Sequence, residues 1–343
     1  MLSTFAAIVA NGKFTPDNCR DKTFLIMSQF KKIHPILQLI IFGGIAMGCF
    51  MIVGFVGSII LANMTGIDLM TLSDPDKWDY TDPSLLTFLR GMLVLQFFAL
   101  FIIPVFIFAR LCDTKPAQYL GLRSAKMLYF ILGITVLIIA LPFVDWTGTI
   151  NHSLIPESTG LGKWMKSMEE DASKQIAYML KRDGINELIL NLVLVAVFAG
   201  VGEELFFRGI LQRLFIKFFK NAWAGIIVTA IIFSAIHLQF YGFIPRLILG
   251  ILLGLIYWYS GSLWPAILAH FIYDAVLIIV AYQRPEMVSN PDQEAIQMSN
   301  QAIGYLISFV LVSLLLGWMI RKSATKYNEV YAEDNIPKKD HPF

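Results

Sequence analysis

The feature that most constrains this chain is a series of apolar segments, each long enough to span or nearly span a bilayer core of about 30 Å. Hydrophobic residues make up 57% of the 343 residues and charged residues only 15%, whereas a soluble domain carries roughly a quarter charged residues. We therefore predict an all-α polytopic membrane protein with about eight transmembrane helices. The approximate ranges are 36–62, 85–110, 127–144, 187–215, 223–238, 244–259, 262–281 and 302–320.

The distribution of Lys and Arg predicts the orientation of these spans. Most basic residues fall in the N-terminal tail, the C-terminal tail, and the second and fourth connections. Because basic connections favour the cytoplasmic side, we expect both termini to be cytoplasmic in a multi-pass protein of the cell membrane. The net charge of +2 gives no basic surface for nucleic acid. The three cysteines are far apart and indicate neither a disulfide framework nor a zinc cluster.

The second outer connection, residues 145–186, contains a helical pattern of its own. Its apolar residues recur at spacings of three and four, with charged residues between them. This periodicity predicts an amphipathic helix that lies on the bilayer surface. Either a packing role or a role as a lid over a membrane-embedded site fits the pattern. The apolar residues are Trp164, Met165, Met168, Ala172, Ile176, Met179 and Leu180.

Three ionisable residues interrupt the fourth apolar segment, in the stretch AGVGEELFFRG at residues 199–209. Each such residue costs about 2.5–3.5 kcal/mol at the centre of a membrane helix. Glu204 and Arg208 lie four residues apart on one helical face, so we expect them to pair. Glu203 lies about 100° from Glu204 around the helix and has no local partner. It can serve as a general base, and the alternative is a purely structural ion-pair cluster.

Two of the five histidines also fall inside apolar segments. They are His237, which ends the run FSAIH, and His270, which begins the run HFIYD. Asp274 follows His270 by four residues and therefore lies on the same helical face. Each of these polar groups needs a partner in a membrane, where water is absent. The pattern predicts a polar site shared by three spans.

Hydrolysis is the chemistry that suits this set of residues. A carboxylate and an imidazole can deprotonate a water molecule while a second imidazole stabilises an oxyanion. Asp274 could orient His270 and fix its tautomer. The alternative is Zn²⁺ bound by Glu204, His237 and His270 with one position open for water. The sequence contains neither an HExxH motif nor a GxSxG motif.

These three motifs, in this order on successive apolar segments, resemble those of the CAAX protease and bacteriocin-processing (CPBP, or Abi) family of intramembrane proteases. The matching residues are Glu203-Glu204-x-x-x-Arg208, Phe233-x-x-x-His237 and His270-x-x-x-Asp274. The resemblance covers roughly residues 186–281. It implies an eight-helix fold with an intramembrane cavity, and a membrane endopeptidase like the CAAX prenyl proteases, of glutamate type or zinc-dependent.

The resemblance also implies a role for each motif residue. Glu203 and His237 would activate water, His270 and residue 274 would stabilise the oxyanion, and Glu204 with Arg208 would support the site. Many members of the family have Asn at the last position, and an ionised Asp cannot donate a hydrogen bond to an oxyanion. Asp274 would therefore be protonated, orient His270 or contact a metal.

The predicted organisation follows from these spans and motifs. We expect a catalytic core at 186–283, preceded at 36–185 by three spans and the loop helix, and followed by a last span at 284–322. Cytoplasmic tails would occupy 1–35 and 323–343. The expected partners are the bilayer and a membrane-anchored peptide or protein substrate. A proton-coupled transporter and a non-catalytic scaffold or regulator of another membrane protein are the alternative functions.

Overall fold

The computed structural model describes residue 30 and residues 33–70, 78–180, 184–284 and 302–323. Most of the two predicted tails, 1–35 and 323–343, therefore lies outside the described residues. All regular secondary structure in the described part is helical, and this part contains no strand. The prediction of an all-α polytopic membrane protein is confirmed.

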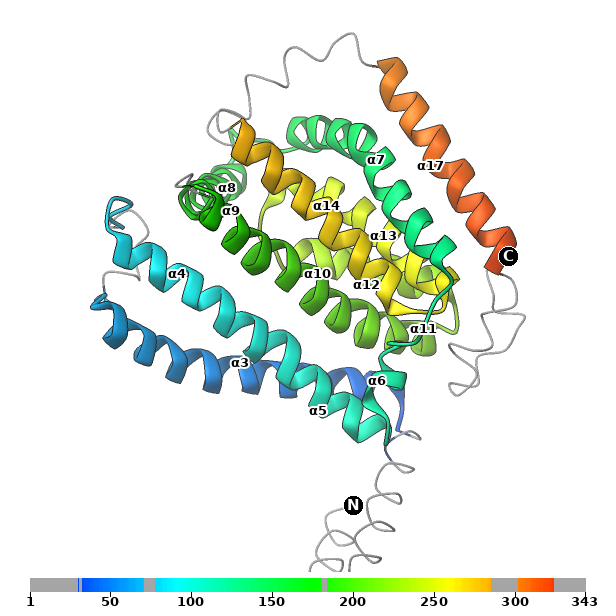
Figure 1. The fold of residues 1–343 in the computed structure, drawn as a ribbon, viewed down its shortest axis with the longest axis horizontal. Helices are drawn as coiled ribbons and strands as arrows, with labels where there is room; N and C mark the ends of the chain where they lie inside the picture. The colour runs from blue at the N-terminus through cyan, green and yellow to red at the C-terminus, as the bar shows by residue number, and fades with distance from the viewer. Residues whose placement is uncertain (1–29, 31–32, 71–77, 181–183, 285–301, 324–343) are drawn as a thin grey trace, which may run out of the picture.

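The N-terminal half contains three long helical spans and one surface helix (Figure 1). The first span is α3, Pro35–Thr65. The second is continuous from Pro83 to Cys112 and comprises α4 (Pro83–Gln96), the π-helical η3 (Phe97–Ile102) and α5 (Ile103–Cys112). The short α6 (Pro116–Tyr119) leads into the third span, α7 (Met127–Ser153), and α8 (Gly160–Met179) follows.

The C-terminal half begins with one helix of 35 residues, Ile185–Phe219. It is divided into α9 (Ile185–Asn191), η4 (Leu192–Val197), α10 (Phe198–Glu203), η5 (Glu204–Gln212) and α11 (Arg213–Phe219), and both η segments are π-helical. The remaining elements are α12 (Ala222–Ala235), the 3-10 turn η6 (Phe240–Gly242), α13 (Phe243–Ser260), α14 (Leu263–Gln283) and α17 (Ala302–Ser323).

Seven of the helices in the described residues are long and apolar enough to cross a membrane. The fifth predicted span, 223–238, corresponds to α12, which is apolar but only 14 residues long. At 1.5 Å per residue it covers about 21 Å, less than the bilayer core. Helix α12 is therefore shorter than the predicted span, and the chain reaches α13 (Phe243–Ser260) through η6 (Phe240–Gly242).

Local sequence signals explain where the motif-bearing helices start and stop. Asn221 caps α12 by accepting a hydrogen bond from the amide of Ala224 at 3.1 Å, and Ser262 caps α14 through the amide of Trp264 at 3.3 Å. Helix α13 ends at Gly261, whose φ of 69° is left-handed and suits glycine. These caps set the positions of the histidines that follow them.

Contacts between connections place the helix ends at two ends of the bundle (Figure 1). At one end, Ser262 donates to the carbonyl of Arg123 and Tyr129 donates to the carbonyl of Lys322. At the other end, Tyr178 donates to the carbonyl of Asp82 at 2.6 Å. The predicted basic connections thus share one end, and the assignment of that end to the cytoplasm stays a prediction.

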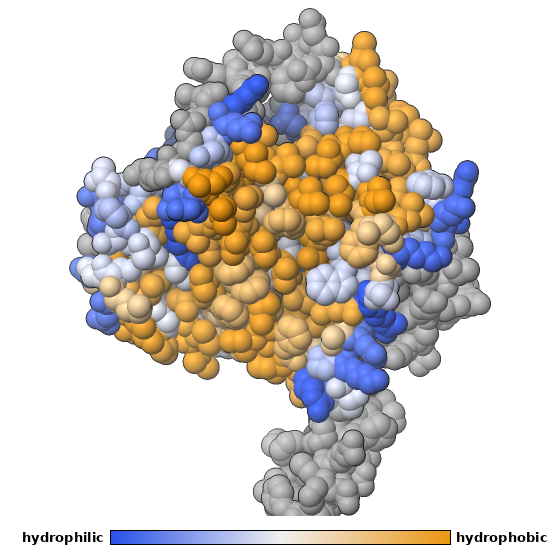
Figure 2. Space-filling model, viewed as in Figure 1, coloured by the Kyte–Doolittle hydropathy of each residue, from blue (hydrophilic) through white to orange (hydrophobic). Residues whose placement is uncertain are grey.

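The middle of the molecule exposes large apolar side chains. Ile40, Met51, Ile52 and Phe55 of α3 are each more than 60% exposed. Figure 2 shows hydrophobic residues across the middle of the visible face, with hydrophilic residues gathered towards its margins. Such an apolar surface is stable when it faces lipid.

Helix α8 has the amphipathic character that the sequence predicts. Only Gly162 of this helix is fully buried, and Trp164 is 47% exposed. The indole of Trp164 packs against Phe240 of η6, with ring centroids 5.2 Å apart. The helix itself is therefore confirmed, while the choice between lid and packing role stays open.

Candidate active site

The six motif residues come from three parts of the C-terminal half. Glu203 ends α10, and Glu204 and Arg208 lie on η5. His237 follows the end of α12, and His270 and Asp274 lie on α14. The structure brings all three parts together, because both His237 and His270 come within 4 Å of Glu203.

The common depth of Glu203 and His237 follows from the length of the helix 185–219. This helix ends at Phe219, six residues beyond Arg213. Arg213 is the first of the basic residues that cluster near this end of the helix. Glu203 therefore lies about 24 Å along the axis from the turn at 220–221. Helix α12 leaves the same turn at Ala222, so His237 lies about 22 Å from it. The two side chains reach the same level on antiparallel neighbours.

Glu204 and Arg208 form a fully buried ion pair. A guanidinium NH of Arg208 donates to Oε1 of Glu204 at 2.6 Å, and the two side chains are 1% and 0% exposed. The second terminal nitrogen of Arg208 donates to the carbonyl of Gly250 at 3.1 Å, and the guanidinium carbon lies 4.7 Å from the centre of the Phe233 ring. A cation held on three sides in this way fixes η5 against α12 and α13.

His270 lies among three carboxylates. Its Nδ1 is 2.9 Å from Oε1 of Glu204, and its Nε2 is 3.4 Å from Oδ2 of Asp274 and 3.9 Å from Oε2 of Glu203. The contact of Nδ1 with Glu204 fixes the plane of the ring and directs Nε2 towards the other two acids. Sequence spacing predicted the contact with Asp274. The contact with Glu204 joins two residues that are 66 positions apart in the sequence and lie on different helices.

Glu203 faces both histidines without touching either. Its Oε1 is 3.8 Å from Nε2 of His237, and its Oε2 is 3.9 Å from Nε2 of His270. Both distances exceed a direct hydrogen bond and suit a bridging water. Nδ1 of His237 lies 2.7 Å from the carbonyl of Phe233. A carbonyl can only accept, so Nδ1 carries the proton and Nε2 presents a lone pair to Glu203.

The predicted zinc ligands do not fit a shared metal ion in this arrangement. Within the described residues, no group of three or more His, Cys, Asp or Glu side chains could hold a metal. Of the proposed set of Glu204, His237 and His270, Oε1 of Glu204 is already bound by Arg208 and by the ring of His270. The histidine nitrogens that face a common acid face Glu203 instead.

Sequence reasoning missed the residues that hold the segment after His237. Arg246, which the sequence motifs did not include, donates to both the side chain and the backbone of Gln239. Asn151 of α7 donates to the carbonyls of Phe240 and Tyr241 at 2.6 and 2.7 Å. The sequence did contain a signal for this contact, because an arginine just inside an apolar span needs a polar partner.

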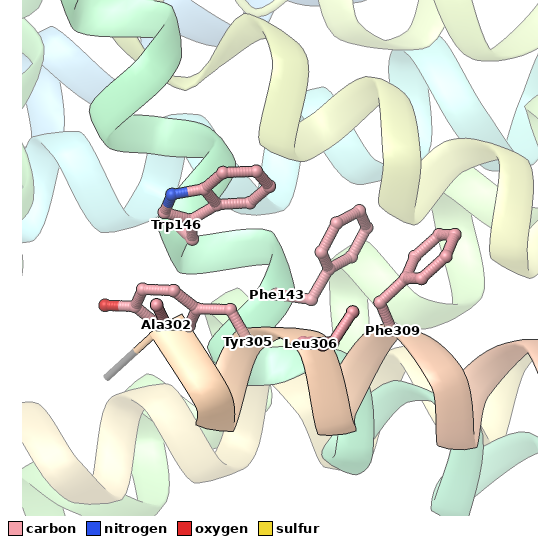
Figure 3. Close-up of a pocket in the computed structure, with 6 residues that line it drawn as sticks. All are labelled: Phe143, Trp146, Ala302, Tyr305, Leu306 and Phe309. Atoms are coloured by element: carbon pink, nitrogen blue, oxygen red, sulfur yellow. The ribbon is translucent and has the colours of Figure 1, made fainter. Parts of the chain in front are cut away.

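A cavity of about 340 Å³ between α7 and α17 lies apart from these residues (Figure 3). Phe143 and Trp146 of α7 face Tyr305, Leu306 and Phe309 of α17 across it, with Ala302 at its edge. The lining is aromatic and aliphatic, and none of the six motif residues belongs to it. Its lining contains no carboxylate and no imidazole.

Comparison with known proteins agrees with the arrangement of the motifs. Residues 185–276 match the family model of the type II CAAX prenyl endopeptidase Rce1-like proteins, and this range contains all six motif residues. The uncharacterized protein YpbD of Bacillus subtilis (strain 168) is 31% identical over 138 residues, 39% of this chain and 66% of the relative. The chain thus matches just under two thirds of that relative's length. No solved structure matches it.

Proposed function

We propose, on the premise that residues 185–276 belong to the Rce1-like family of type II CAAX prenyl endopeptidases, that this chain is an intramembrane endopeptidase. It would hydrolyse peptide bonds in membrane-anchored peptides or proteins with a water activated by Glu203. The observation that carries the proposal is the position of Glu203, whose two oxygens face imidazole nitrogens at 3.8 and 3.9 Å, one from the turn after α12 and one from α14.

The first step is deprotonation of a water held between Glu203 and His237. Water can donate one hydrogen to the carboxylate and the other to Nε2 of His237, which presents a lone pair because Nδ1 is bound to a carbonyl. As one proton moves to Glu203, the water oxygen forms a bond to the carbonyl carbon of the substrate. The carbonyl π electrons move to oxygen, which gives a tetrahedral oxyanion.

The second step is collapse of this intermediate. A protonated His270 donates from both nitrogens, so Nδ1 can stay bound to Glu204 while Nε2 stabilises the oxyanion. Asp274, 3.4 Å from Nε2, orients the ring. Glu203 then returns its proton to the amide nitrogen as the C–N bond breaks, which releases an amine and a carboxylic acid. Arg208 and Glu204 support the site and contact no reacting atom.

The test is cleavage of two fluorescence-quenched peptides by purified protein in detergent, one with a prenylated C-terminal tail and one with a single membrane-spanning segment. We expect cleavage of at least one peptide and a loss of about 100-fold or more in Glu203→Gln and His237→Gln. Equal cleavage by the wild type and both variants would contradict the proposal. Cleavage that a chelator abolishes and zinc restores would contradict the glutamate mechanism.

The alternative functions predict different results in the same experiment. A proton-coupled transporter would move protons across vesicles in a Glu203-dependent manner while cleaving neither peptide. A scaffold would cleave neither peptide, and its capture of a membrane protein would be unaffected by Glu203→Gln. Either outcome would replace the endopeptidase proposal.

A further inference from the structure

Arg246 lies in the first turn of α13, within the apolar span 240–260. Both terminal nitrogens of its guanidinium bind one residue: one donates to Oε1 of Gln239 at 2.9 Å, and the other donates to the Gln239 backbone carbonyl. The Nε of Arg246 is buried and has no hydrogen-bond partner within the described part of the chain. A cation in a span is costly, and here it holds both polar ends of Gln239.

Gln239 lies two residues beyond His237, across a strained backbone position. The residue between them, Leu238, has a φ of 54°, in the left-handed region that non-glycine residues rarely adopt. Such a conformation is unfavourable and persists only where the surroundings impose it. The double hydrogen bond from Arg246 to Gln239 is a restraint that acts directly on this segment.

The guanidinium is confined on its other side by Gly242. A Cβ added to Gly242 would lie 2.8 Å from a terminal nitrogen of Arg246 and 3.0 Å from its Cζ. Real Cβ atoms do not approach so closely, so any side chain at this position would displace the guanidinium. The space between Gln239 and Gly242 is therefore just wide enough for the arginine head group.

The charge of Arg246 also interacts electrostatically with two acids, Glu169 of α8 and Glu203. Glu169 accepts a hydrogen bond from the amide of Tyr241 at 3.2 Å. Arg246 is therefore coupled by charge both to the acid that faces His237 and to an acid of α8.

We propose that Arg246 is a positioning residue for the hydrolytic reaction: by holding Gln239 it fixes the segment that carries His237, so that Nε2 of His237 faces Glu203. The proposal rests on the proposed function for its kinetic consequence. Its structural part, the orientation of the His237 ring, stands independently. Loss of the restraint lets Leu238 relax and His237 turn away. A displacement of about 1 Å in a catalytic group lowers the rate by roughly 100-fold.

The kinetic test compares Arg246→Met, Arg246→Lys and Gly242→Ala, with Gly148→Ala as the control. Gly148 lies on α7, and its added Cβ would meet Pro245 at an ordinary 3.6 Å. We expect Arg246→Met to lower kcat by about 10- to 100-fold with little change in KM. Arg246→Lys is expected to keep only part of the rate, because a single ammonium group cannot bind both the side-chain oxygen and the backbone carbonyl of Gln239 as the guanidinium does. Gly242→Ala lowers kcat, and Gly148→Ala leaves it unchanged.

A second readout does not depend on activity. The protein is labelled with ¹⁵N-histidine, and the signals of His237 are identified by their loss in His237→Gln. The wild type is expected to show His237 as the Nδ1-protonated tautomer, and Arg246→Met to show a mixture of tautomers. Wild-type kcat together with an unchanged His237 spectrum in Arg246→Met would overturn this proposal. If Glu203→Gln cleaves as fast as the wild type, the proposed function fails, while the spectrum still decides the role of Arg246.

Discussion

Replacing Arg208 with methionine removes the cation from the most deeply buried ion pair of the site. The guanidinium is 1% exposed and the Glu204 carboxylate 0% exposed, with 2.6 Å between them. Methionine fills much of the volume but supplies no hydrogen bond. Glu204 then keeps only the contact from Nδ1 of His270, and the carbonyl of Gly250 loses its donor. The substitution leaves a charge uncompensated where water cannot reach it.

The expected cost is about 3–5 kcal/mol of unfolding free energy, the range for breaking a buried pair by removing one partner. The double variant Glu204→Gln with Arg208→Met removes both charges and keeps an amide oxygen for His270. Its cost should therefore be well below the sum of the two single variants. This non-additivity follows from the shared burial of the two groups.

The assay is reversible unfolding of the purified protein in detergent, followed by loss of helical circular dichroism. The matched control is Lys166→Met, which breaks an ion pair of similar length, 2.9 Å, between side chains that are 46% and 39% exposed. An exposed pair contributes only about 0–1 kcal/mol. If Arg208→Met costs no more than Lys166→Met, or if the two single costs simply add, the buried-pair reasoning is refuted.

Three further predictions concern residues in or next to the segments that connect the helices. Gly121→Ala should cost about 1 kcal/mol or more in thermal unfolding, because φ is 78° and the new Cβ would lie 2.7 Å from a buried tyrosine hydroxyl. Asn151→Leu should cost about 1–3 kcal/mol in the same measurement, since it removes three hydrogen bonds to the backbone around η6. Hydrogen bonds from Lys166 and Tyr241 lower the pKa of Glu157 below its ordinary 4.5. The link between the start of α8 and η6 therefore holds above that pH and is lost as the pH falls through the lowered value. Hydrogen exchange of residues 160–179 should rise on acidification in the wild type, and in Glu157→Gln it should be raised already at neutral pH.

Sequence periodicity was sufficient to predict the helices and the residues that gather at the site. The i,i+4 spacing of Glu204 with Arg208 and of His270 with Asp274 predicts two of the contacts, because both pairs lie within single helices. The amphipathic helix at 160–179 was equally visible in its spacing.

Contacts between helices could not be read from spacing. His270 contacts Glu204 across two helices, so the carboxylate that pairs with Arg208 also binds an imidazole. The length of the helix 185–219 was also underestimated, because the helix continues four residues beyond the predicted end at 215. Arg213 lies inside it and packs over Tyr119. The hydrogen bonds from Arg246 to Gln239 follow a left-handed backbone turn at Leu238. The intrinsic conformational preference of leucine does not predict such a turn.

The π-helical segment η5 has a consequence for length variation in this chain. Glu204 and Arg208 both lie in η5, whereas Glu203 ends the α-helical segment before it. A π turn contains one residue more than the α-helical path it replaces. Deleting one residue between Glu204 and Arg208 would remove this extra residue, so the helix beyond η5 would keep its α-helical phase. The fold could then survive as a regular helix while Glu204 and Arg208 lay three residues apart instead of four. A chain one residue shorter here would keep its membrane span and lose the spacing of the residues that support the candidate site.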